Sequence, residues 1–93
     1  MLLLLLGCND PCEQACAVTA REVARCIDGW NAEWEDLGAS SRTDFRAQCD
    51  EDWRSLRAEL EAREVRRAKE QCELAVDEAA TLSCDAWRAM YLE

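Results

Sequence analysis

Cysteine is the residue type in this chain with the most chemistry open to it, because thiols can form disulfides, bind metals or act as nucleophiles. The 93 residues contain seven cysteines and no histidine. The usual general base and the commonest zinc ligand are therefore missing. No Cys-x-x-Cys pair occurs, although that spacing is typical of zinc knuckles and of thioredoxin-type redox sites. The pattern favours structural disulfides and leaves a metal site or a redox pair as weaker alternatives.

Six of the cysteines lie in the charged body of the chain, on or beside stripes of apolar residues at helical spacing. They are Cys12, Cys16, Cys26, Cys49, Cys72 and Cys84. The seventh, Cys8, ends an apolar run of five leucines and a glycine. This run is too short to span a bilayer, which takes about 20 apolar residues. Cys8 therefore needs a separate explanation.

Leu5, Leu6, Gly7 and Cys8 resemble the lipobox of bacterial lipoproteins. That motif has a Leu at position −3, small residues at −2 and −1, and an invariant Cys at +1. The resemblance implies cleavage before Cys8, a diacylglyceryl thioether on its sulfur and an acylated new N-terminus. Two or three acyl chains anchor a protein stably in a membrane, because each buried methylene contributes roughly 0.8 kcal/mol.

The chain departs from the lipoprotein pattern at two points. Leu6 is larger than the usual residue at its position, and no Lys or Arg precedes the apolar run, whereas a signal peptide has a basic first segment. We therefore expect Met1 to be an internal methionine, with the true start upstream. Residues 1–7 are then a residual signal segment, residues 8–10 a lipidated tether, and residues 11–93 a single cysteine-rich helical domain. The alternative is a leucine run that packs on the domain or frays.

Lipidation of Cys8 would leave an even number of cysteines, enough for three disulfides. This parity agrees with translocation, because disulfides persist in oxidising compartments. The resemblance implies the bacterial cell envelope, facing the periplasm or the cell exterior. Asn9 follows Cys8, whereas the family's sorting rules associate an Asp there with retention in the inner membrane. The outer membrane is therefore slightly favoured.

The composition narrows the classes of function. The net charge is −9, from 20 acidic and 11 basic residues, which argues against nucleic acid and against direct attraction to anionic lipid surfaces. The carboxylate clusters at 33–36 and 50–52 lack the glycine-containing loop of an EF-hand. No Ser or Cys has a base to activate it. We expect no enzymatic activity, no cofactor, no bound metal and no small-molecule substrate.

The scarcity of helix breakers predicts an all-α fold. The chain has three glycines and one proline among many Ala, Glu, Arg and Leu residues. We expect a first helix over 11–36, capped by Asp10 and followed by a turn at Gly38. A second helix, capped by Ser41 or Thr43, is expected to continue to about residue 80. The alternative is a break at 62–65, which would give three similar helices.

A short final helix is expected after Ser83, which is a plausible cap. The predicted architecture is a disulfide-stapled helical hairpin with a short third helix, or a three-helix bundle. A hairpin that turns near Gly38 places Cys26 close to Cys49, and this is the favoured single disulfide. The remaining bridges would join Cys12 and Cys16 to Cys72 and Cys84.

The function that these features favour is a lipid-anchored envelope protein that presents a rigid helical surface to a protein partner not identified by the sequence. Trp30 and Trp34 lie one helical turn apart and are possible binding residues, since Trp is enriched at binding hot spots. Burial in the core is the commoner role for such residues.

Two other functions remain open. One is a soluble disulfide hairpin that acts as a binder or inhibitor, either secreted or in the intermembrane space. The spacing of Cys12, Cys16 and Cys26 resembles half of the twin-cysteine hairpins of the mitochondrial intermembrane space, but Cys72 and Cys84 do not fit the other half. The second is a protein that handles metals or thiols.

Overall fold

The computed structural model describes residues 10–93, and within them the chain is all-α, as predicted. The predicted signal segment 1–7 and the lipidation site Cys8 lie outside the described residues. The helices are α2 (Pro11–Cys26), α3 (Arg42–Glu59), α4 (Ala62–Ala79) and α5 (Cys84–Leu92). Two 3-10 segments, η1 (Ile27–Trp30) and η2 (Trp34–Leu37), connect α2 to α3.

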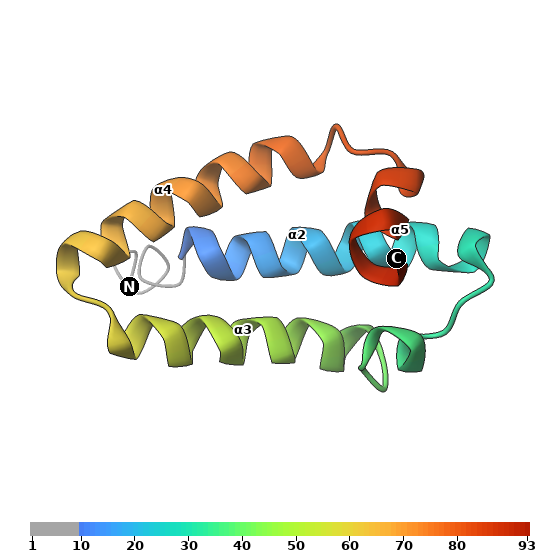
Figure 1. Cartoon of the computed structure of the whole chain (residues 1–93), viewed down its shortest axis with the longest axis horizontal. Coiled ribbons are helices and arrows are strands. Elements are labelled where there is room, and N and C mark those ends of the chain that lie inside the picture. Colours follow the sequence, from blue (N-terminus) through green and yellow to red (C-terminus); the bar gives the residue numbers. More distant parts are fainter. Residues whose placement is uncertain (1–9) are drawn as a thin grey trace, which may run out of the picture.

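The central helix is α2, which lies between α3 and α4 (Figure 1). It packs against both of these helices, whereas α3 and α4 make few contacts with each other. The short helix α5 crosses the end of α2 and also packs on η2. The main buried cluster lies at this end and contains Val23 and Cys26 of α2, Ala79 of α4 and Trp87 of α5.

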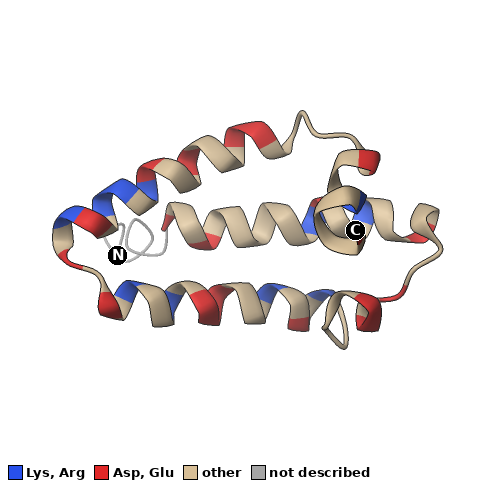
Figure 2. Cartoon of the chain, viewed as in Figure 1, with Lys and Arg blue, Asp and Glu red and all other residues tan. Residues whose placement is uncertain are grey.

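The distribution of charge follows from the central place of α2. Figure 2 shows acidic and basic residues along α3 and α4, with Lys and Arg gathered in the first half of α4, whereas most of α2 is uncharged. Charged side chains keep their hydration on the two outer helices, while α2 supplies the small and apolar side chains of the interior. No helix in residues 10–93 combines the length and the apolar character needed to cross a membrane.

The prediction of one helix over 11–36 was wrong, because α2 ends at Cys26. The chain continues as η1, whose cap Asn31 has a φ of 59°. Asn tolerates this left-handed conformation better than most residues, and it stops the helical path. The next segment, η2, ends at Gly38 with a φ of 80°, so the predicted turn at Gly38 is confirmed.

The prediction of one helix over 43–80 was also wrong. The chain has the break of the alternative prediction, but at residues 60–61 rather than at 62–65. α3 ends at Glu59, and Leu60 is extended, with φ −94° and ψ 149°. Glu61 and Glu64 then form a capping box that starts α4, in which the Glu61 N–H donates to Glu64 Oε1 at 3.0 Å. The chain reverses at this break, so α4 runs back along α2 and packs its apolar side against it.

The starts of α2, α3 and α5 agree with the predicted caps. The side chain of Asp10 accepts a hydrogen bond from the Cys12 N–H at 2.8 Å, and Pro11 occupies the first turn. Ser41 Oγ accepts from the N–H of Asp44 at 3.1 Å, and Ser83 Oγ accepts from that of Ala86 at 3.1 Å. Each cap satisfies a backbone donor that a helix start leaves unpaired.

The conformation of Gly38 gives a stability prediction. A Cβ at this position would meet no atom within 4 Å, so Gly38→Ala changes only the cost of the left-handed backbone. We expect it to destabilise the oxidised protein by about 1 kcal/mol. Gly29→Ala is the matched control, because Gly29 is equally open without a positive φ, and it should be neutral or slightly stabilising. Denaturant unfolding followed by circular dichroism would test this, and equal effects would contradict it.

Candidate functional site

Three disulfides join the helices, and each has one end on α2. Cys12–Cys72 links α2 to α4, Cys16–Cys49 links it to α3, and Cys26–Cys84 links it to α5. The bridged Cα atoms lie 4.9, 5.7 and 5.4 Å apart, in the same order, within the usual range for disulfides. The six cysteines predicted to form structural bridges therefore all do so.

The favoured pair Cys26–Cys49 was wrong, because the two helices meet in a different register. In the antiparallel pair of α2 and α3, Cys16 is level with Cys49. Cys26 lies nearly three helical turns farther along α2, at the end where α5 crosses, and it bonds to Cys84 there. Of the bridges expected from Cys12 and Cys16 to the end of the chain, the structure contains Cys12–Cys72.

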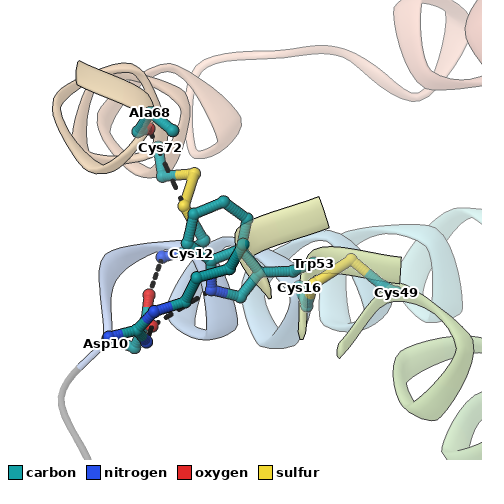
Figure 3. Close-up of a disulfide and its surroundings, with 8 residues drawn as sticks. Asp10, Cys12, Cys16, Cys49, Trp53, Ala68 and Cys72 are labelled. Atoms are coloured by element: carbon teal, nitrogen blue, oxygen red, sulfur yellow. Dashed lines mark hydrogen bonds and ion pairs between the residues drawn. A yellow bond between two sulfur atoms is a disulfide. The ribbon is translucent and has the colours of Figure 1, made fainter. Parts of the chain in front are cut away.

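A buried carboxylate fixes the start of α2 on α3. Asp10 is only 7% exposed. Its Oδ2 accepts a hydrogen bond from Trp53 Nε1 at 3.0 Å and pairs with Arg57 Nη1 at 2.9 Å, in addition to the bond from the Cys12 N–H to Oδ1. Figure 3 shows Asp10 and Trp53 beside the Cys12–Cys72 bridge. Asp10 therefore caps α2 and also accepts hydrogen bonds from two side chains of α3.

The surroundings of Asp10 favour its charged form. Burial by itself raises the pKa of this carboxyl. The hydrogen bonds from the Trp53 indole and the Cys12 N–H, together with the positive charge of Lys69, outweigh burial and hold the pKa below its ordinary value. The ionised carboxylate therefore stabilises the folded state at neutral pH.

An apolar groove runs over α2 beside this network. It has a volume of about 480 Å³, which is within the range of ligand sites in proteins. The bridges Cys12–Cys72 and Cys16–Cys49 lie in its floor, Phe45, Trp53 and Leu56 of α3 form one wall, and Tyr91 of α5 closes one end. The groove is the candidate functional site, because it combines exposed apolar surface with covalently fixed helices.

The predicted binding residues Trp30 and Trp34 do not line this groove. Both are partly buried against the main core cluster. Trp30 Nε1 donates a hydrogen bond to the carbonyl of Cys84 at 3.1 Å, and the ring of Trp34 packs on Phe45 with centroids 5.4 Å apart. These contacts give both residues a structural role at the α5 end, while a role in binding stays a prediction.

The side chains that form the groove wall were present in the sequence pattern but were not singled out as a site. Phe45, Trp53 and Leu56 repeat at helical spacing with Cys49 on one face of α3. That spacing predicts a buried face. Leu56 is nevertheless 49% exposed and Tyr91 is 38% exposed, which no periodicity could have indicated.

The groove offers apolar contact and few groups for chemistry. All six cysteines in residues 10–93 are bridged, so the described part of the chain has no free thiol. The same part contains no group of three or more Cys, Asp or Glu side chains placed to hold a metal ion. The arrangement suits recognition of an apolar surface.

No protein-family model, curated protein or solved structure matches this chain. The geometry of the groove and the residues around it therefore carry the functional interpretation.

Because Asp10 is charged in the folded protein, the free energy of unfolding depends on pH in the acidic range. Because its folded pKa lies below the ordinary value of 3.8, its contribution is present above about pH 4 and is lost as the pH falls through the folded pKa. Asp10→Asn should destabilise the oxidised protein by about 1–3 kcal/mol at pH 7 and should lose less stability than wild type between pH 5 and about pH 2. Thermal unfolding across this range measures both effects. Asp28→Asn, at an exposed position, is the control, and an equal pH slope in both variants would contradict the assignment.

The disulfide connectivity predicts a specific peptide map. Trypsin alone is uninformative, because no Lys or Arg lies between Cys12 and Cys16. Cleavage after glutamate separates these two at Glu13 and also separates Cys72 from Cys84. Combined digestion without reduction should release peptides joined as 12–72, 16–49 and 26–84. A joined 26–49 peptide would contradict the structure.

Proposed function

We propose that this protein is a lipid-anchored component of the bacterial cell envelope that presents a rigid helical surface to a protein partner. The observation that carries the proposal is the pairing of six cysteines in three bridges. These bridges use every cysteine in residues 10–93, and the remaining cysteine of the sequence, Cys8, is the residue that follows the lipobox-like Leu5, Leu6 and Gly7. Acylation of its sulfur gives this cysteine a role that its neighbours do not have.

The disulfides favour a location outside the cytoplasm, because bridges of this kind persist where thiols are oxidised. They also support an interaction function. Each bridge fixes a helix to α2, so the groove loses little conformational freedom when a partner binds. A surface fixed in advance in this way reaches a given affinity with less contact area than a flexible one.

The apolar groove favours a protein partner over a catalytic role. Its lining contains aromatic and aliphatic side chains, two disulfides and few polar groups. Clustered aromatic and aliphatic side chains on a rigid surface are typical of the central part of protein interfaces. A soluble secreted binder with the same groove is the alternative, and it differs from the proposal only in the state of Cys8.

Intact mass spectrometry tests the anchor. The protein should be expressed in a bacterial host with its native upstream region and purified from the membrane fraction. We expect a chain that begins at Cys8, carries the mass of the acyl groups and gains six hydrogens on reduction of its three disulfides.

The matched control is Cys8→Ser, which should abolish both the acyl mass and the cleavage before residue 8 while leaving the three disulfides intact. A wild-type chain that retains Met1 without added mass would overturn the lipid anchor and would favour the soluble binder.

A further inference from the structure

Three long helices border the groove, one fewer than in a four-helix bundle. In a four-helix bundle each helix packs against two neighbours around a shared core. Here α3 and α4 both pack on α2 but make few contacts with each other. The short α5 covers only one end of the space, through Tyr91, whose ring meets Phe45 with centroids 5.5 Å apart. The remaining length of the groove is open.

The open length matches a short helix. The groove wall on α3 runs from Phe45 to Leu56, a distance of about 16 Å along the helix axis, or about three turns. A helix of this length presents apolar residues at i, i+3, i+4 and i+7 along one stripe, which is the usual pattern for helices bound in grooves. The half-exposed Leu56 is placed to contact such a stripe.

The charge within the groove lining is negative. Asp52 is the one charged residue in the groove lining, and no described residue forms an ion pair with it. Three arginines of α3 are paired with other carboxylates, Arg46 with Asp50, Arg54 with Glu13, and Arg57 with Asp10. The whole chain carries a net charge of −9. A cationic ligand is therefore favoured at this surface.

We propose that the groove binds a basic amphipathic α-helix of a partner protein, about three turns long. The apolar stripe of this helix packs on the disulfide floor and on Trp53 and Leu56, and a Lys or Arg beside the stripe pairs with Asp52. This inference rests on the proposed interaction function and specifies the chemistry of the partner. Burial of apolar surface supplies most of the affinity, while the charges orient the helix and accelerate association.

The test uses the oxidised full chain and a synthetic helical peptide of about 12 residues, with Leu at the stripe positions and Lys elsewhere. Fluorescence anisotropy of the labelled peptide gives the Kd, and the NMR signal of the Trp53 indole N–H reports occupation of the groove. Peptides with the same Leu pattern but Glu in place of Lys, and with a scrambled order of Leu and Lys, are the ligand controls. We expect saturable binding of the Lys peptide alone, weakened by added salt.

Two variants with matched controls locate the site. Leu56→Asp and Asp52→Lys should each weaken binding of the Lys peptide by about tenfold or more. Leu74→Asp and Asp77→Lys make the same changes at exposed positions of α4 outside the groove, and they should leave the Kd within about twofold. Circular dichroism of each variant checks that the helices are retained, which is expected because all four positions are exposed.

Several results would overturn the inference. These are no binding of the Lys peptide, equal binding of the Glu or scrambled peptide, and equal weakening by Leu74→Asp and Leu56→Asp. Binding that appears only when Leu4→Asp disrupts the leading leucines would show that the chain's own N-terminus occupies the groove. Concentration-dependent dimerisation that Leu56→Asp abolishes would assign the groove to a second copy.

The peptide assay is independent of lipidation, so the two proposals fail separately. An acylated Cys8 in a protein that does not bind the peptide contradicts the groove assignment and leaves the lipid anchor standing. Specific peptide binding by a protein with an unmodified Cys8 contradicts the anchor and leaves the groove assignment standing.

Discussion

The attachment of every disulfide to α2 is the constraint on which the rest of the structure depends. A chain of this size buries too little apolar surface to hold four helices by packing alone, and the main buried cluster in residues 10–93 consists of Val23, Cys26, Ala79 and Trp87. The three bridges compensate by restricting the conformations of the unfolded chain. Each bridge typically stabilises the folded state by about 2–4 kcal/mol. Because they all start from α2, the outer helices need not pack on each other, and the groove between them can stay open without a loss of stability in the fold.

Asp10 connects the local and the tertiary levels of this structure. At the local level it caps α2, and at the tertiary level the same carboxylate holds the indole of Trp53 and the guanidinium of Arg57 on α3. Trp53 is in turn a wall residue of the groove. The electrostatics at the start of α2 therefore set the position of a side chain in the candidate site, although Asp10 itself does not line it.

The features that could be predicted from the sequence are those decided by a few neighbouring residues. The caps at Asp10, Ser41 and Ser83 and the turn at Gly38 belong to this class, as does the even number of bridged cysteines. The end of the helical path after η1 depended on the left-handed backbone of Asn31, which competes with the apolar spacing of Trp30 and Trp34. The partner of Cys26 and the exposure of Leu56 depend on the register of helices distant in sequence. Periodicity along one helix shows which face is apolar, but not whether another helix covers it.

The order of the bridges along the chain has a mechanical consequence. Cys12–Cys72 and Cys26–Cys84 close a covalent ring from the two chain segments 12–26 and 72–84. A pulling force between the two ends of the protein enters this ring at Cys12 and leaves it at Cys84. The helix α3 lies outside the ring and is attached to it only through Cys16–Cys49 and its own flanking chain. The tension would therefore not be transmitted through α3. The groove wall that α3 forms would keep its shape when the protein is pulled.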